Sequence, residues 1–380
     1  MTTIHAEAAA ARQVEVDDIL SKIELMDTEE TPVKGFSPGN RFAAFLFSLL
    51  SIGLLVFTYY SAAISPIPAF VQRAVHLAFI ICLCAIVYPS GFKILSRNRR
   101  LEEALNLLMM GVGALCILYL VFNWKQLYTA DITPFDQIVA LLIVLIVLEI
   151  TRRSIGMTLV LIVFIGVAYA MLGPHLPEII SHRGYTLKRI LSQIAVGTEG
   201  LFGSTLGIAS TYVAGFIFFA GFLEAFGGLR IFMKLALSIS GALAGGPAKI
   251  AVVASGFFAM ISGSTVANVV STGSITIPLM RRMGYRNAWA GAVEAVASTG
   301  GTITPPVMGA TAFILSEFMG VSYLEVMKAA IIPAFLYYAG LFAAVHAQSK
   351  KMGFTGMPRE KLPELKSALI RSAHLILPIL

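Results

Sequence analysis

The sequence predicts an all-α protein that crosses a membrane several times. Hydrophobic residues make up 57% of the chain and charged residues 13%, and that charged fraction is about half of what a soluble domain carries. The apolar residues gather in stretches that approach the ~20 residues a helix needs to cross a bilayer. Basic residues lie in short clusters between these stretches, as the positive-inside rule describes. The net charge of +7 therefore indicates membrane orientation, and not binding to nucleic acid.

The first part of the chain is predicted to be a cytoplasmic tail followed by four membrane helices. Residues 1–40 are mostly polar, and no signal peptide is expected among them. Four apolar stretches follow within a predicted domain at residues 41–153, namely residues 42–60, 71–88, 101–122 and 135–150. Basic residues around Arg99 and at Arg152–Arg153 follow the second and fourth stretches, so those ends and the N-terminus are predicted to be cytoplasmic.

The next part, residues 154–354, alternates spans with surface segments. Residues 157–172, 206–226 and 329–347 are predicted spans, and residues 230–240 form a predicted interfacial helix on the inner side. Residues 355–380 are predicted to be a polar linker and the start of a further span, because the final apolar run is too short to cross. Only one interrupted hairpin is visible, so we expect the first half of an inverted-repeat transporter.

The most informative segment is residues 248–280, which is apolar but interrupted by Ser262-Gly263-Ser264-Thr265-Val266-Ala267-Asn268. Inside hydrocarbon, a broken helix persists only where protein or a polar cavity satisfies its backbone groups. Basic residues flank the segment at Lys249 and Arg281, which places both of its ends on the inner side. The segment is therefore predicted to be a re-entrant hairpin with its tip at residues 262–268.

A second break separates the apolar residues 287–302 from residues 307–318 and contains Thr299-Gly300-Gly301-Thr302-Ile303-Thr304-Pro305-Pro306. Two consecutive prolines cannot donate backbone hydrogen bonds, so carbonyls one turn earlier lose their partners. Paired Gly-, Ser- and Thr-rich breaks of this kind are typical of the ion and substrate site of a secondary transporter. Close packing of small residues between membrane helices is the alternative reading.

The two breaks supply the oxygens that a hard cation such as Na⁺ prefers, which are carbonyls, hydroxyls and amide oxygens. The residues that supply these oxygens are Ser262-Gly263-Ser264-Thr265-Val266-Ala267-Asn268 at the hairpin tip and Thr299-Gly300-Gly301-Thr302 before Pro305-Pro306 in the second break. Those predicted to bind an anionic substrate are Thr265, Thr304 and Pro306. Glu294 is a candidate for proton or charge coupling, with pairing to a neighbouring helix or a position at the inner interface as alternatives.

Other chemistry receives no support from the sequence. It contains no nucleophile–base pair, no phosphate-binding loop and no metal-binding motif, which argues against an enzyme. Cys82, Cys84 and Cys116 lie in apolar runs without partners at metal spacing, so neither a disulfide framework nor a transition-metal site is expected. No cofactor is expected beyond Na⁺ as the coupling ion.

The sequence around both breaks resembles a known family. The run from Phe257 to Asn268, the Ile277-Pro278-Leu279-Met280 segment, Gly284-Tyr285, Ala297-Ser298-Thr299 and Pro305-Pro306 resemble the large membrane subunit of tripartite ATP-independent periplasmic (TRAP) transporters. The four-helix unit before them looks like the small subunit, as in fused permeases of the type that partner TAXI binding proteins. Two departures are Asn268, where many relatives have Asp, and Val307, where many have Ser.

The resemblance implies an elevator-type permease in the bacterial inner membrane. Such a permease would import a small carboxylate with sodium, after a periplasmic binding protein delivers it. It also implies that the chain stops after the first repeat and that the first sodium site is formed by Ser262, Gly263, Ser264, Asn268, Gly300, Gly301, Thr302 and Pro305. Two other functions stay open at this point, a dicarboxylate or citrate symporter without a binding protein and a scaffold subunit that does not transport.

Overall fold

The computed structural model describes residues 41–90, 99–129 and 132–354, together with residues 356, 362, 363 and 365. The predicted tail at residues 1–40 and most of the predicted linker at residues 355–380 lie outside this part of the chain. The described residues are almost entirely helical and contain no strand. Seven helical segments in them are long and apolar enough to cross a membrane, namely Arg41–Ile64, Ala69–Val87, Leu101–Leu127, Pro134–Ser154, Met157–His175, Ser204–Ala225 and Tyr323–Lys351. The prediction of an all-α polytopic membrane protein is confirmed.

The chain divides into two compact units, and the border lies between Gly215 and Phe216. This border falls inside helix α10 (Ala214–Ala225). The domain boundary predicted between residues 153 and 154 stays a prediction, because a compact unit and a subunit-like domain need not end at the same residue.

The first unit contains the four predicted helices of the N-terminal membrane domain. They are α2 (Arg41–Tyr59), α3 (Ala69–Val87), α5 (Arg99–Thr129) and α6 (Pro134–Ser154). Helices α3, α5 and α6 share an apolar core, in which Ile81, Leu120 and Ile143 are fully buried. At the end of α6, Glu149 forms ion pairs with Arg152 at 2.8 Å and Arg153 at 2.7 Å, as the helical spacing predicts.

The rest of this unit consists of one longer helix and several short segments. They are α7 (Met157–Leu172), η2 (Gly173–His175), α8 (Leu187–Leu191), η3 (Ser192–Val196), α9 (Ser204–Ile208) and η4 (Ala209–Val213). The segments α9, η4 and α10 follow one another without a gap and together form a single span-length helix.

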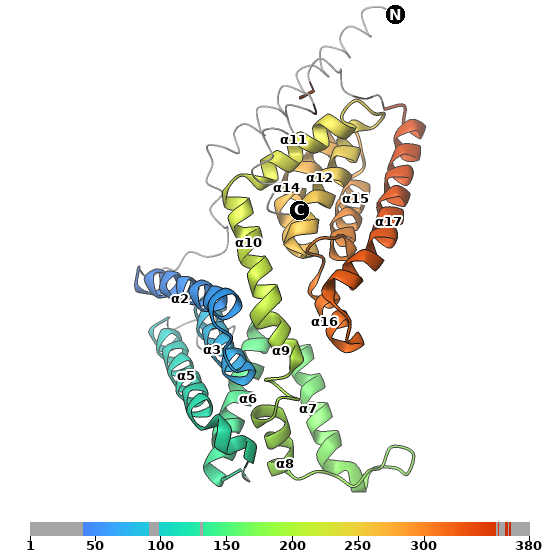
Figure 1. Ribbon diagram of the computed structural model, residues 1–380. Helices are drawn as coiled ribbons and strands as arrows, with labels where there is room; N and C mark the ends of the chain where they lie inside the picture. The colour runs from blue at the N-terminus through green and yellow to red at the C-terminus, as the bar shows by residue number, and fades with distance from the viewer. Residues whose placement is uncertain are drawn as a thin grey trace, which may run out of the picture. The chain divides into compact units, whose positions relative to one another are not determined.

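The second unit holds both predicted breaks. Its helices after α10 are α11 (Gly228–Ser240), α12 (Gly246–Ser262), α13 (Thr265–Ser271), α14 (Gly273–Arg282), α15 (Asn287–Gly300), α16 (Ala310–Met319) and α17 (Tyr323–Lys351). Helix α12 is the most enclosed of these and contacts α11, α14, α15 and α17 (Figure 1). The amphipathic helix α11 buries Phe232, Met233 and Leu237, and its apolar face packs on α12.

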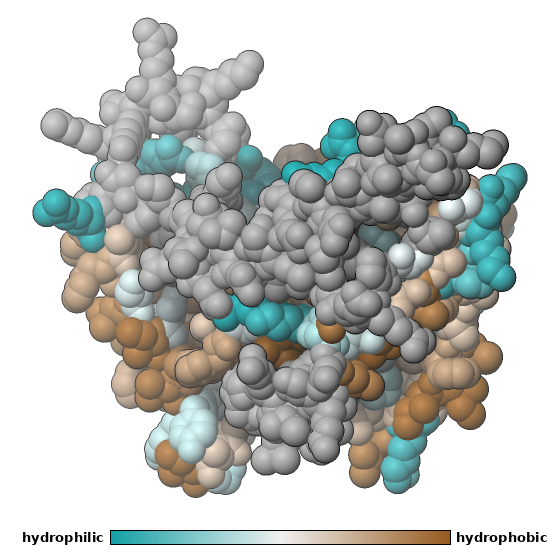
Figure 2. Space-filling view, turned by 90° about the horizontal axis from the view of Figure 1, so that it is seen from above, coloured by the Kyte–Doolittle hydropathy of each residue, from teal (hydrophilic) through white to brown (hydrophobic). Residues whose placement is uncertain are grey.

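Many large apolar side chains in both units face outward. Phe122 is 77% exposed, Phe335 70% and Phe318 76%. Figure 2 shows hydrophobic residues over much of the visible surface on both sides of the view. Exposed apolar surface of this extent is expected where helices face lipid.

Candidate functional site

The hairpin break is made by one glycine and one serine. Helix α12 ends at Gly263, whose φ of +60° is a left-handed conformation that glycine adopts without steric cost. Ser264 begins the next helix, because its hydroxyl accepts a hydrogen bond from the Ala267 backbone N–H at 3.3 Å. Helices α13 and α14 then run back along α12, so that Asn268 and Thr272 contact Ser255. The segment is therefore interrupted and folds back on α12, and its re-entrant placement in the membrane stays a prediction.

The second break is wider than the sequence predicts. Helix α15 ends at Gly300, a 3₁₀ turn covers Gly301–Ile303, and helix α16 resumes only at Ala310. The sequence places the restart at Val307, but Val307 and Gly309 use their N–H groups elsewhere in the fold. Val307 N donates to Met260 O at 3.2 Å, and Gly309 N donates to Thr302 O at 2.8 Å. The peptide bond between Pro305 and Pro306 is cis.

The two breaks meet in space. A Cβ atom on Gly263 would collide with the carbonyl oxygen of Met308, and a Cβ atom on Gly301 would collide with Ala259 on α12. Glycine at both positions therefore lets the main chains of the two breaks approach each other. Met308, at φ +59°, is the single non-glycine residue with positive φ in the described part of the chain. Such a conformation is costly for a methionine and is often found where function requires it.

Carbonyl oxygens of the second break accept hydrogen bonds from nearby threonines. Thr302 Oγ1 donates to Thr299 O at 2.8 Å, and Thr304 Oγ1 donates to Gly300 O at 2.7 Å. The Gly301 backbone N–H also donates to Thr299 O, so both carbonyls belong to the hydrogen-bonded turn of the second break. Among the predicted site residues, Gly300 and Gly301 are buried, whereas Thr302, Thr304, Pro305 and Pro306 are partly buried.

The predicted residues at the hairpin tip divide into two groups. Ser262, Gly263, Ser264 and Thr265 lie at the break itself, and the Ser262 hydroxyl has only a long 3.5 Å contact with Ser264 N. Asn268 lies one turn further along and is fully buried. Its amide nitrogen donates to Ser255 O at 3.0 Å and to Ser255 Oγ at 2.7 Å. The Asn268 amide therefore ties the returning arm of the hairpin to α12.

Glu294 belongs to the same buried polar cluster, which is defined by six fully buried residues: Ser255, Asn268, Thr272, Thr276, Glu294 and Ser298. One carboxylate oxygen of Glu294 accepts from Thr272 Oγ1 at 2.5 Å and from Ser255 Oγ at 3.0 Å. The other oxygen accepts from Thr276 Oγ1 at 2.5 Å. Of the two alternatives considered for Glu294, the structure shows contact with neighbouring helices and excludes exposure at the inner interface.

Four members of the buried polar cluster are absent from the residues predicted to bind ions or substrate: Ser255, Thr272, Thr276 and Ser298. The sequence does contain a signal for them. Asn268, Thr272 and Thr276 are spaced by four residues, as are Glu294 and Ser298, and such residues share one face of a helix. A single Ser or Thr in an apolar helix usually donates a hydrogen bond to its own backbone. Only the four-residue spacing from Asn268 or from Glu294 therefore distinguishes these residues in the sequence.

Helix α17 supports the end of α15 with two tyrosines. Tyr338 Oη donates to Ala297 O at 2.7 Å, and Tyr337 Oη donates to Val296 O at 2.8 Å. The last carbonyls of a helix lack partners within that helix, and these phenols supply donors close to the second break. A Cβ atom on Gly300 would collide with both tyrosine rings, so the glycine permits this contact.

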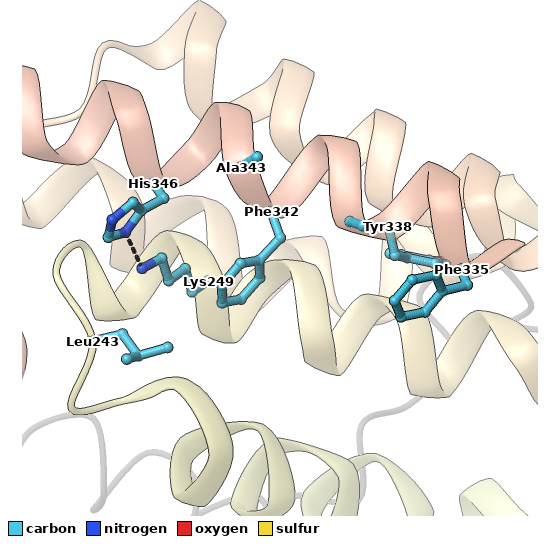
Figure 3. Close-up of a pocket in the computed structure, with 8 residues that line it drawn as sticks. Leu243, Lys249, Phe335, Tyr338, Phe342, Ala343 and His346 are labelled. Atoms are coloured by element: carbon cyan, nitrogen blue, oxygen red, sulfur yellow. Dashed lines mark hydrogen bonds between the residues drawn. The ribbon is translucent and has the colours of Figure 1, made fainter.

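A cavity of about 530 Å³ lies between α12 and α17 (Figure 3). Its lining is mostly apolar, but Lys249 Nζ lies 2.7 Å from His346 Nδ1 and 4.9 Å from the centre of the Phe342 ring. From the sequence, Lys249 is predicted to be a basic residue that flanks the hairpin on the inner side of the membrane. In the structure its side chain is only 1% exposed. Lys249 is therefore enclosed by the protein, because the loop before α12 and helix α17 cover it.

Comparison with known proteins identifies the family. The sequence pattern of the family described as "Tripartite ATP-independent periplasmic transporter, DctM component" matches residues 142–380. The chain is 35% identical over 147 residues to the isethionate TRAP transporter permease protein DctMQ of Oleidesulfovibrio alaskensis. The matched region covers 38% of this chain and 23% of that protein. It is 30% identical over 149 residues to the C4-dicarboxylate TRAP transporter large permease protein DctM of Pseudomonas aeruginosa, which covers 39% and 34%.

A third relative is the sialic acid TRAP transporter permease protein SiaT of Haemophilus influenzae, with 30% identity over 164 residues, or 43% of this chain and 26% of that protein. Each of these matches spans about a third or less of the relative's own length. All three relatives are permease proteins and not enzymes. Because the family pattern covers 239 of the 380 residues, from 142 to 380, and includes both breaks, the chain belongs to the DctM family of TRAP transporter permease components.

Proposed function

We propose that the chain acts in a sodium-coupled secondary transporter that imports a small carboxylate across the bacterial inner membrane. In this proposal a periplasmic binding protein delivers the solute to the permease. Support for the solute class comes from the relatives, whose names specify isethionate, C4-dicarboxylates and sialic acid. All three are small organic acids that are anionic at neutral pH, and the last two carry carboxylates.

The observation that carries this proposal is the meeting of two broken helices through Gly263 and Gly301. Their contact brings the carbonyls of Thr299 and Gly300 to the same region as the hairpin tip with its serine hydroxyls. Hydroxyl and carbonyl oxygens are suitable ligands for Na⁺. We infer that the cation lies between the tip residues Ser262, Gly263, Ser264 and Asn268 and the residues of the second break.

The proposed substrate residues adjoin this cation site. Thr265 lies in the first turn of α13, and Thr304 and Pro306 lie in the second break. A carboxylate held next to a bound cation gains Coulomb attraction, most of all where water is excluded. This proximity would make solute binding depend on sodium, which is the basis of coupled transport.

Replacing Ser262 by alanine tests the sodium site with little effect on the fold. The Ser262 hydroxyl has no short hydrogen bond among the described residues, so its loss removes a candidate ligand and not a structural contact. We expect the sodium concentration for half-maximal uptake to rise about tenfold, which corresponds to ~1.4 kcal/mol. Uptake of labelled organic acid into proteoliposomes containing the transporter with this chain, measured over a series of sodium concentrations, provides the measurement.

Ser274→Ala is the matched control, because this exposed serine lies on α14 and bonds only to Ser271 O. An unchanged sodium requirement in Ser262→Ala would remove this residue from the proposed site. Sodium-independent uptake by the unmodified transporter would refute sodium coupling itself. Full uptake without any binding protein would favour the symporter alternative instead.

A further inference from the structure

Glu294 has an unusual environment for a carboxyl group in a membrane protein. It is fully buried on α15, and it is surrounded by hydroxyl groups from α12, from the returning arm of the hairpin and from its own helix. Among the described residues, no basic side chain bonds to it. An ionised carboxylate buried without a cationic partner is costly, and ionisable groups inside membrane proteins usually mark ion or proton paths.

The charged and titratable groups of the helices around Glu294 are engaged elsewhere. Lys249 on α12 pairs with His346, and Arg281 and Arg282 on α14 are exposed at the end of that helix. From α17, Tyr338 faces this region, but its hydroxyl donates to Ala297 O. Helix α13 and the 3₁₀ turn after α15 carry no titratable residue. Among the described residues, the groups that hydrogen-bond to the Glu294 carboxyl group are therefore all hydroxyls.

The distances in the buried polar cluster are those of hydrogen bonds to a charged group. Glu294 lies 2.5 Å from both Thr272 Oγ1 and Thr276 Oγ1. Charge-assisted O–H···O bonds have lengths of about 2.5–2.7 Å. The two hydroxyl groups are therefore placed to donate to the carboxylate.

The hydroxyl groups can serve both forms of the carboxyl group. When Glu294 is ionised, Thr272 and Thr276 donate to it. When Glu294 is protonated, it can donate to Thr276 Oγ1, and the threonine hydrogen then turns to Thr272 O at 3.0 Å. The same rotation is available to Thr272, whose hydroxyl also lies 2.8 Å from Asn268 O. A hydroxyl group is both donor and acceptor, so both threonine hydroxyls keep a partner in either form.

We propose that Glu294 is a proton-binding site of this permease, and that it takes up and releases one proton in each transport cycle. The proton comes from water and returns to water, and no other bond is formed or broken. Thr272 and Asn268 connect the site to the hairpin tip, because Asn268 N donates to Ser264 O at 3.0 Å. Protonation thereby acts on the segment that forms the proposed cation site, and this use in transport rests on the proposed function.

Proton binding can be tested on the purified chain without any transport. Infrared difference spectra between acidic and alkaline samples should contain the carbonyl band of a buried protonated carboxyl group. We expect the band to be lost in Glu294→Gln and to be retained in Glu224→Gln, which changes an exposed carboxylate in the same unit. The variant Thr276→Val, which removes one hydrogen-bond partner, should displace the pH at which the band titrates. Identical spectra for the unmodified chain and Glu294→Gln would overturn the proposal.

Transport supplies the second measurement. Uptake by the transporter containing Glu294→Gln should lose most of its dependence on an imposed pH gradient, whereas Glu224→Gln should retain it. If the infrared band titrates but uptake by Glu294→Gln keeps its dependence on the pH gradient, the coupling role of Glu294 is overturned. Uptake that depends on pH through Glu294 but not on sodium would refute the sodium site alone and would support the proton site.

Discussion

Asn268 shows how one buried amide can stabilise a hairpin inside a membrane protein. It lies on α13, and both hydrogens of its amide group are directed at Ser255 on α12. Its amide oxygen lies 3.1 Å from Thr272 Oγ1, which can donate to it when that hydroxyl turns away from Glu294. In the absence of water, each of these groups would otherwise lack a partner. The side chain therefore holds the two arms of the hairpin together and also contributes to the environment of Glu294.

Replacing Asn268 by alanine should destabilise the hairpin by ~1–3 kcal/mol, because it leaves the Ser255 carbonyl and hydroxyl groups with fewer partners in a buried site. A lower midpoint of thermal unfolding of the purified chain in detergent is the expected result. Ser274→Ala, an exposed position on the same arm, should leave the midpoint unchanged. Equal midpoints for Asn268→Ala and the unmodified chain would show that this amide does not stabilise the hairpin.

At the scale of helices, both breaks depend on where each helix stops. Gly263 ends α12 and Gly320 ends α16, and both adopt nearly the same left-handed conformation, with φ of +60° and +63°. Their surroundings differ. A Cβ atom on Gly263 would meet the Met308 carbonyl oxygen, whereas a Cβ atom on Gly320 would have no atom within 4 Å. A comparison of alanine substitutions at the two glycines therefore separates the effect of backbone strain from the effect of the close contact between the two breaks.

Gly263→Ala should consequently abolish uptake, while Gly320→Ala should reduce stability by only ~1 kcal/mol and leave uptake close to normal. The first variant combines an unfavourable φ with a collision that pushes the two breaks apart. Uptake per amount of folded transporter, together with fluorescence-detected size-exclusion profiles, distinguishes loss of function from loss of folding. Similar uptake by the two variants would mean that the contact between the breaks is not required.

Most of the architecture could be predicted from the sequence, because it follows from short-range patterns. The apolar stretches gave the helices, and Gly263 with Ser264 marked the hairpin break. The restart of the helix after Pro306 could not be predicted, since Val307 N bonds to a carbonyl on another helix. The burial of Lys249 and the partners of Glu294 were also inaccessible, because they depend on contacts between segments far apart in the chain. The sequence could locate the two breaks that hold the proposed ligands, but it could not predict the buried polar cluster, which joins several helices.

At the scale of the whole molecule, the distribution of basic residues sets the orientation in the membrane. Arg152 and Arg153 lie in the last turn of α6, and Lys350 and Lys351 lie in the last turn of α17. Such clusters favour the cytoplasmic side. Because the chain reverses at Gly263, the segment from α12 to α14 either crosses the membrane and returns or does not cross it at all. Both ends of this hairpin are therefore expected on the cytoplasmic side.

Cysteine labelling from either side of the membrane tests this arrangement. In a variant in which alanine replaces Cys82, Cys84 and Cys116, single cysteines are placed at exposed positions. Those at Ala242 and Asn287, which precede and follow the hairpin, should react with a membrane-impermeant maleimide only after the membrane is opened. A cysteine at Ser181, in the loop after α7, should react in intact spheroplasts. If Ala242 and Asn287 were labelled from opposite sides, the segment would cross the membrane, and the paired breaks could not form the proposed cation site.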